Sequence, residues 1–211
     1  MLRNGLYKNV QIIRTNIKFF ALQHFLLSIA LLLMTCILFD TSNLDQYMVA
    51  LPLELIVSLI GIIMLTPIFA PEENSDLADL MLSKSFSYFK IIGFRVLYSF
   101  VMLVVFIGSF TIFLSYQHSD VTMMHFLGTI ASAIFLGGLG LCIAAICNHV
   151  IVGYMGAMLF YVMNFFSGDQ LKGLYLFGMA EGSSYEKYWQ ALIGIFMIGL
   201  AFLRKRNRIT R

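Results

Sequence analysis

The sequence PEENSDLADLMLSKSFSYFKIIGF, from Pro71 to Phe94, is the longest polar interruption between apolar stretches that also contains lysine. Carboxylates come first in it, then an apolar turn around Leu80, then basic and aromatic residues. Acidic residues near the start of a helix and basic residues near its end interact favourably with the helix dipole, and proline suits the first turn. We therefore predict a short amphipathic helix over residues 72–84, with one face available to a partner.

On both sides of this stretch the chain is strongly apolar. Of its 211 residues, 60% are hydrophobic and 12% are charged, and the mean hydropathy is +0.86. Soluble domains have about 45–50% apolar and about 25% charged residues. The composition predicts an all-α, polytopic membrane protein in which residues 1–211 form a single transmembrane domain.

About 20 apolar residues are needed to cross a bilayer, and six stretches approach or exceed this length. Before them, the apolar residues of 1–18 recur at helical spacing, which predicts an amphipathic helix on the membrane surface. Residues 167–187 are apolar in their middle but too few to cross, so we expect short external helices that dip into the outer leaflet. The expected spans are 19–39, 49–70, 91–116, 123–147, 150–166 and 188–203.

Two of these spans have a distinctive composition. The second contains Pro52 near its start and Pro67 near its end, which predicts a kinked or locally unwound helix. The fourth is rich in glycine, alanine and serine, which permit close approach of helix backbones in lipid. Because only Asn148 and His149 separate it from the fifth span, we expect these two spans to form a closely packed hairpin.

Basic residues indicate the orientation, because they are enriched on the cytoplasmic side of membrane proteins. Twelve lysines and arginines lie at the two termini and in 71–95, whereas only Lys172 and Lys187 lie in the segment before the last span. Both termini and the opening stretch are therefore expected in the cytoplasm, and residues 167–187 outside.

The sequence contains no phosphate-binding G-x-x-x-x-G-K-[ST] motif, so any ATP hydrolysis is expected in another polypeptide. The three cysteines lie in apolar stretches without nearby ligands, and we expect no metal, cofactor, catalytic site or nucleic-acid partner. Glu72 and Glu73 are similar to the paired glutamates of one class of intramembrane protease. That alternative is disfavoured, because Asn74 follows them here where those pairs are followed closely by arginine.

Several residues are candidates for a transport pathway. Glu54 is a carboxylate within a span and thus a functional candidate, although solvation near the outer surface is an equally good explanation. The fifth span contains Met155, Met158 and Met163, whose thioethers adapt to varied apolar shapes, with ordinary packing between spans as the alternative.

The layout of the whole chain resembles the permease subunits of type 2 ATP-binding-cassette exporters. Locally, Glu73 is followed by a leucine-rich turn and then by Ser83, Lys84 and Ser85, a similar order to the family's segment after the second span. The proline usual in that segment is absent, with Ser85 and Phe86 in its place. The leucine-rich turn comprises Leu77, Leu80, Met81 and Leu82.

The resemblance implies that residues 72–84 are a coupling helix seated in a separate ATPase subunit, which holds the ATP and magnesium. A helix lying on lipid is the alternative. Apolar anchors for affinity and flanking charges for register suit such docking. The coupling residues would be Glu72, Glu73, Asp76, Leu77, Leu80, Met81, Leu82 and Lys84.

The resemblance also implies a second permease, either the same or a related chain, in a bacterial plasma membrane. Cargo would pass between the two permeases, and an outer gate would include Leu174 and Phe177. The apolar pathway favours a hydrophobic or amphipathic cargo, such as a bacteriocin-like peptide toxin or a lipid-like compound. A substrate-capture subunit of an importer is the alternative, but those subunits keep a polar pocket near the outer face, and the sequence shows no comparable cluster.

Overall fold

The computed structural model describes residues 22–73, 88–168, 173–183 and 185–209. The predicted surface helix over 1–18 lies outside these residues, as does most of the predicted coupling helix. Within the described residues, five helices are long and apolar enough to cross a membrane, and Leu22–Leu38 is a shorter apolar helix. The multi-pass helical architecture is thus confirmed. The exact number of six spans remains a prediction, because the expected first span, 19–39, begins outside the described residues.

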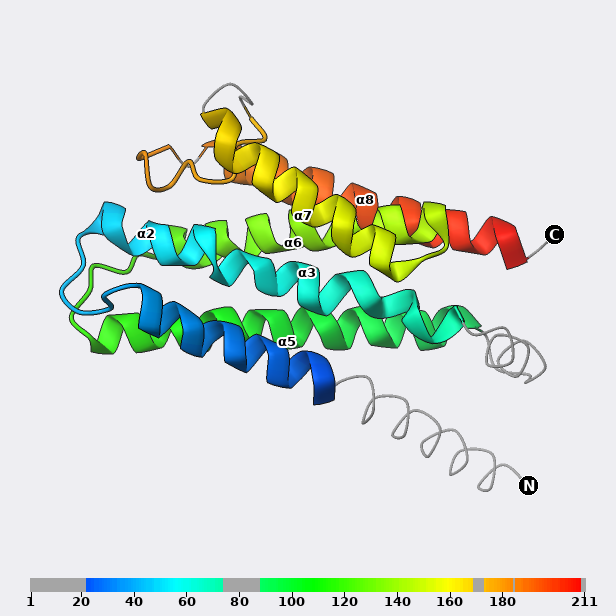
Figure 1. Cartoon of the computed structure of the whole chain (residues 1–211), viewed down its shortest axis with the longest axis horizontal. Helices are drawn as coiled ribbons and strands as arrows, with labels where there is room; N and C mark the ends of the chain where they lie inside the picture. Colours follow the sequence, from blue (N-terminus) through cyan, green and yellow to red (C-terminus); the bar gives the residue numbers. More distant parts are fainter. Residues whose placement is uncertain (1–21, 74–87, 169–172, 184, 210–211) are drawn as a thin grey trace.

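Successive helices run antiparallel to one another, along the long axis of the molecule (Figure 1). The order after Leu22–Leu38 is a span broken into short helices, which ends at Glu72, and then four long helices. We call the end of the bundle where the broken span and α6 begin, at the left of Figure 1, the Glu54 end. The opposite end is the Glu73 end. The long helices are α5 (Tyr88–Tyr116), α6 (Met123–Cys147), α7 (Val150–Ser167) and α8 (Tyr185–Ile209).

The predicted interruption of the second span is confirmed. This span consists of α2 (Gln46–Leu55), the 3₁₀ helix η1 (Val57–Leu59), α3 (Ile60–Leu65) and the 3₁₀ helix η2 (Thr66–Glu72). Pro52 lies inside α2 and Pro71 inside η2. Proline lacks an N–H group and disrupts regular helical bonding, so carbonyl groups at such breaks need other donors.

Side chains from other helices supply these donors. The Tyr161 hydroxyl of α7 donates to the Leu55 carbonyl at 2.6 Å, where α2 ends. At the other end of the span, Arg95 Nη1 of α5 donates to the Ile68 carbonyl at 3.2 Å. The Arg95 side chain is only 6% exposed, so its guanidinium lies inside the bundle at this break. The interruption is therefore built into the packing of the bundle.

We expect Tyr161→Phe to lower the free energy of unfolding by about 1 kcal/mol, because it removes one hydrogen bond and leaves the Leu55 carbonyl without its donor. Denaturant titration of the purified protein in detergent measures this change. Tyr188→Phe is the matched control, since the Tyr188 side chain is 64% exposed on α8. Equal stability of the two variants would contradict the role of the Tyr161 hydroxyl.

Helix α6 lies at the centre of the bundle, against the broken span, α7 and α8. A Cβ atom added at Gly61 of α3 would collide with the Ala133 carbonyl of α6. A Cβ atom at Gly153 of α7 would lie 2.5 Å from the Gly140 carbonyl oxygen. The small residues of α6 therefore permit backbone contact with several neighbours, and the expected close packing of α6 with α7 is confirmed.

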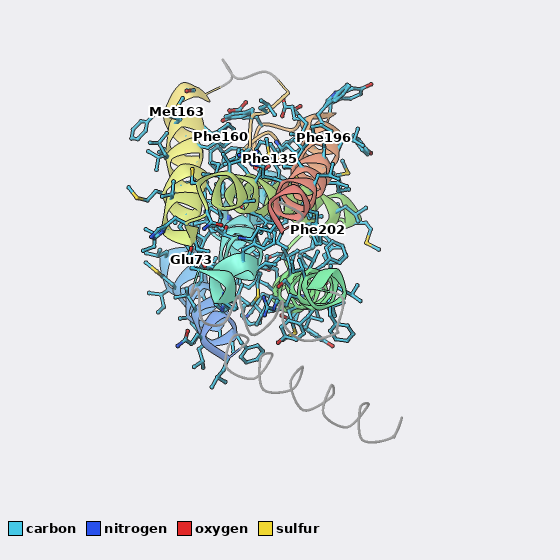
Figure 2. The ribbon with its side chains drawn as sticks, turned by 90° about the vertical axis from the view of Figure 1, so that its right-hand side faces the viewer. Glu73, Phe135, Phe160, Met163, Phe196 and Phe202 are labelled. Atoms are coloured by element: carbon cyan, nitrogen blue, oxygen red, sulfur yellow. The ribbon has the colours of Figure 1, made fainter. Side chains whose placement is uncertain are left out.

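The outer helices expose most of their apolar surface. In the apolar windows of the broken span and α6, 72% and 67% of residues are buried, against 22% in both α7 and α8. Between α6 and α7, the rings of Phe135 and Phe160 pack edge to face with centroids 5.3 Å apart (Figure 2). The broken span and α6 are thus the interior of the bundle, and α7 and α8 lie at its edge.

Two turns meet at the Glu54 end. The Ser119 hydroxyl donates to the Thr41 carbonyl at 3.0 Å and accepts from the Leu44 amide at 3.2 Å. In the turn before α2, the backbone amide of Ser42 donates to the Asp40 carboxylate, and so does the Ser42 hydroxyl. These two hydrogen bonds, the first with the larger effect, lower the pKa of the exposed Asp40 carboxyl group. These bonds join the turn before α2 to the turn before α6.

Candidate functional site

A buried ion pair lies at the Glu54 end. Glu54, in the last turn of α2, and Lys187, in the first turn of α8, place Oε1 and Nζ 2.6 Å apart. Their side chains are only 1% and 2% exposed. Removing charges from water is costly, so such a pair requires further hydrogen bonds to both groups.

The carboxylate of Glu54 has two additional donors in the loop between α7 and α8. Its Oε1 accepts from the Met179 amide at 3.0 Å, and its Oε2 accepts from the Ala180 amide at 3.1 Å. The backbone of Glu54 is also held, because the Ser58 hydroxyl donates to its carbonyl at 2.6 Å. These hydrogen bonds therefore hold Glu54 against the loop, close to the break after α2.

Lys187 is held in the same way by acceptors. Its ammonium donates to Ser132 Oγ of α6 at 2.8 Å and to the Leu176 carbonyl at 2.6 Å. Ser132 in turn donates to Gln190 Oε1 at 2.8 Å, and Gln190 Nε2 donates to the Tyr175 carbonyl at 2.6 Å. The bonds of Lys187 and Gln190 thus connect α8 to α6 and to the loop.

Asn164 of α7 completes this set of contacts. Its Nδ2 donates to the Leu174 carbonyl at 2.8 Å, and its Oδ1 accepts from the Leu176 amide at 2.8 Å. The Asn164 side chain is fully buried. The loop 173–183 is therefore hydrogen-bonded to side chains of α2, α7 and α8. We call these side chains, together with the Ser132 hydroxyl that links Lys187 to Gln190, the polar cluster: Glu54, Ser132, Asn164, Lys187 and Gln190.

The loop also contributes apolar side chains to the interior. Phe177 is 7% exposed, and its ring centroid lies 5.7 Å from that of Tyr161 and 5.8 Å from those of Phe165 and Tyr175. Leu176 packs in the same apolar group. The loop is therefore held by polar bonds and filled by aromatic contacts. Other buried members of this group are Ile62, Phe135, Leu136 and Ala157.

The structure separates the predicted pathway residues into two groups. Glu54 lies beside the loop that contains Leu174 and Phe177, and both of these pack in the apolar group at the Glu54 end. The methionines lie instead on the outer face of α7, where Met155, Met158 and Met163 are 66%, 45% and 52% exposed.

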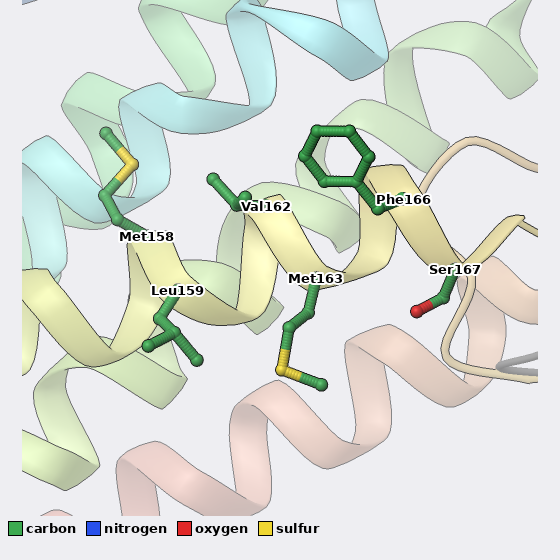
Figure 3. Close-up of a pocket in the computed structure, with 6 residues that line it drawn as sticks. All are labelled: Met158, Leu159, Val162, Met163, Phe166 and Ser167. Atoms are coloured by element: carbon green, nitrogen blue, oxygen red, sulfur yellow. The ribbon is translucent and has the colours of Figure 1, made fainter.

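Two of these methionines line a shallow groove. It has a volume of about 580 Å³ and includes Met158, Met163 and Phe166. Figure 3 shows Met163 and Leu159 projecting from one side of α7, and Met158, Val162 and Phe166 from the other. The groove is thus an apolar surface at the edge of the bundle.

Two expectations are corrected here. Solvation does not explain Glu54, because its side chain is 1% exposed and bonded to Lys187. The sequence did not indicate that polar side chains from distant segments come together: Glu54, Lys187, Ser132 and Gln190 form one bonded chain at the Glu54 end, and Asn164 bonds to the same loop. Lys187 was assigned to the external segment, but α8 begins at Tyr185. The sequence contained one signal of this cluster, which is the presence of two amide side chains, Asn164 and Gln190, inside apolar stretches.

Residues 173–183 form consecutive turns, and residues 169–172 lie outside the described part of the chain. The short external helices expected between the last two spans therefore remain a prediction. What the structure adds is that Leu176, Phe177 and Met179 of this segment are buried in the bundle.

At the Glu73 end, two further side chains fix the start of α7. Glu73 accepts a hydrogen bond from the Val150 amide, the first residue of α7 (Figure 2). A carboxylate at a helix N-terminus is favourable. Lys205 of α8 donates to Asn148 Oδ1 at 3.0 Å, between α6 and α7. Of the predicted coupling residues, Glu72 and Glu73 lie in the described part of the chain, and Asp76, Leu77, Leu80, Met81, Leu82 and Lys84 lie outside it.

No group of three His, Cys, Asp or Glu side chains placed to hold a metal ion occurs among the described residues. The polar cluster contains one carboxylate and one ammonium that bond to each other, to the loop backbone and to Ser132. This arrangement is suited to holding the loop in place. Comparisons of the chain with protein-family models, curated proteins and solved structures found no match.

Proposed function

We propose that this chain is the permease subunit of an ATP-driven exporter, powered by a separate ATPase subunit. One observation carries the proposal: the broken span is joined to other elements in its first helix and just after its last. After η2, Glu73 binds the start of α7, and in α2 Glu54 binds loop 173–183 and the start of α8. The predicted coupling helix, 72–84, follows directly from this span.

This arrangement gives a route for mechanical coupling between the two ends. A partner that moves residues 72–84 would displace η2, and with it Glu73 and the start of α7. The breaks at η1 and η2 are places where the span can bend, since helices bend where regular hydrogen bonding is interrupted. Movement at the Glu73 end would thus reach the loop at the Glu54 end.

The exposed surface of α7 supports an apolar or amphipathic cargo. Met158, Met163 and Phe166 line an open groove there, and a second permease facing this surface would enclose it. We assign the Glu73 end to the cytoplasm of a bacterial plasma membrane, because Arg95 and Lys205 lie there and the sequence predicts most other basic residues on the same side. Peptide toxins and lipid-like compounds both suit such a pathway.

The double variant Leu80→Asp/Met81→Asp tests the coupling part of the proposal. We expect membranes of the native cell to yield the tagged chain in normal amount, while the ATPase activity that copurifies with it falls at least tenfold. The reason is that two carboxylates would replace the apolar anchors of the docking helix. Phosphate release from the purified complex measures this activity.

Ser85→Asp/Ser87→Asp is the matched control, because it adds the same charge to the same stretch and keeps Leu80 and Met81. Copurifying ATPase activity should remain near the wild-type value in this control. If the wild-type chain copurifies with no ATPase, or if Leu80→Asp/Met81→Asp retains full activity, the proposed coupling is wrong.

A substrate-capture subunit of an importer remains a second candidate, and the polar cluster favours it, because such subunits keep polar residues near the outer face. Against it, the charged groups of this cluster already bond to one another and to the loop. Flux of a fluorescent amphipathic peptide in inside-out vesicles discriminates the two: ATP-dependent accumulation inside the vesicles indicates export, and ATP-dependent loss indicates import.

A further inference from the structure

We propose that Glu54 and Lys187 form a latch, which opens without unfolding of the bundle and releases the second half of loop 173–183 together with the start of α8. The place of this opening in a transport cycle rests on the proposed function. The latch itself does not, because it concerns only the described contacts of this chain.

The first observation is that two charged groups, and not apolar side chains, make this buried contact. Apolar side chains of similar volume often hold a buried site at least as well as an ion pair does. A charge pair differs in what happens when the contact separates, because water then solvates both groups and offsets the broken contact. The 2.6 Å pair between Glu54 and Lys187 thus gives a tight closed state and an open state of accessible free energy.

The second observation is that the bonds to the loop are divided between its two halves. In the first half, Asn164 of α7 bonds to Leu174 and Leu176, and Lys187 and Gln190 of α8 donate to the carbonyls of Leu176 and Tyr175. In the second half, the amides of Met179 and Ala180 donate to Glu54. Separation of the ion pair would therefore free the second half and leave the first half attached to α7.

The loop backbone is compatible with such a movement. Gly173 and Gly182 lie at its two ends with positive φ values of 75° and 82°. Glycine adopts this region without steric cost and accommodates large changes in backbone angle. Between them, Phe177 fills the space beside Tyr161 and Phe165, so opening of the latch would uncover an apolar surface next to α7.

Hydrogen exchange of the full chain in detergent micelles tests the latch. In the wild type, we expect the amides of Met179 and Ala180 to exchange at least tenfold faster than those of Leu136 and Leu141 in α6. Local opening exposes amides without global unfolding, so such a difference identifies a separate opening. Equal rates in the loop and in α6 would overturn the proposal, because they would mean that the loop opens only when the bundle unfolds.

Variants then assign the opening to the ion pair. Glu54→Gln should accelerate exchange at Met179 and Ala180 at least tenfold over the wild type. The double variant Glu54→Leu/Lys187→Met removes both charges together with the acceptors of these two amides, so its loop should exchange at least as fast as that of Glu54→Gln. Lys205→Met, at the Glu73 end, is the control and should leave loop exchange unchanged.

Ser132→Ala provides a milder test if Glu54→Gln fails to fold, since it removes one acceptor of Lys187 and keeps both charges. It should accelerate loop exchange about threefold. If Glu54→Gln folds, unchanged exchange of its loop amides would overturn the latch. If only Ser132→Ala folds, unchanged exchange of the loop amides in that variant would overturn it. If the loop behaves as expected but no ATPase copurifies with the chain, the latch is supported and the assignment as an exporter is wrong.

Discussion

Replacing Lys187 with methionine is expected to lower the free energy of unfolding by about 3–5 kcal/mol, because a buried carboxylate would lose its cation. Methionine nearly preserves the length of the side chain but cannot donate to Ser132 or to the Leu176 carbonyl. Denaturant unfolding in detergent, followed by circular dichroism, measures the loss. The fluorescence of Trp189, the only tryptophan of the chain, gives a local signal beside the substituted position.

The charge-swapped variant Glu54→Lys/Lys187→Glu sharpens this prediction. It restores the attraction between opposite charges, yet we expect it to remain as unstable as Lys187→Met. The reason is that the Met179 and Ala180 amides need an acceptor at position 54, while the Leu176 carbonyl needs a donor at position 187. Recovery of wild-type stability in the swap would show that charge attraction, and not the hydrogen-bond pattern, holds the site.

The second large effect is expected for Gly194→Val in α8. A Cβ atom at this position would lie 2.7 Å from the Cα atom of Phe135 and 2.8 Å from its backbone nitrogen. Since these are backbone atoms of α6, the clash is relieved only when the two helices separate. We expect a loss of about 3 kcal/mol, measured by the same unfolding titration.

Gly199→Val is the matched control on the same helix. A Cβ atom at Gly199 would have no neighbour within 4 Å, so this variant should unfold within about 0.5 kcal/mol of the wild type. If Gly194→Val is as stable as Gly199→Val, the close approach of α6 and α8 does not contribute to stability.

Much of the architecture was predictable from local properties of the sequence. Long apolar stretches predicted the membrane helices, and Pro52 and Pro67 predicted the interrupted span. The small residues of the fourth span predicted close packing, although they did not indicate that α8 and α3 approach α6 as closely as α7 does. These features depend on composition within a single segment, which is what a sequence displays.

The candidate site was only partly predictable, because it depends on contacts between distant segments. Glu54 was recognised as a carboxylate within a span, but its partner Lys187 lies at the far end of the chain. The sequence also did not show that the methionines lie on the outer face of α7. A helix that is apolar on all sides, such as α7, gives no periodic signal to show which face points inward.

The buried ion pair also constrains how the protein is made. Ribosomes synthesise α3, α5, α6 and α7 between Glu54 and Lys187, so the carboxylate enters the membrane long before its cation exists. During that interval the Glu54 carboxylate needs water or another polar partner, since a lone buried carboxylate is costly. The ion pair can therefore form only after α8 has been synthesised and has packed beside α2.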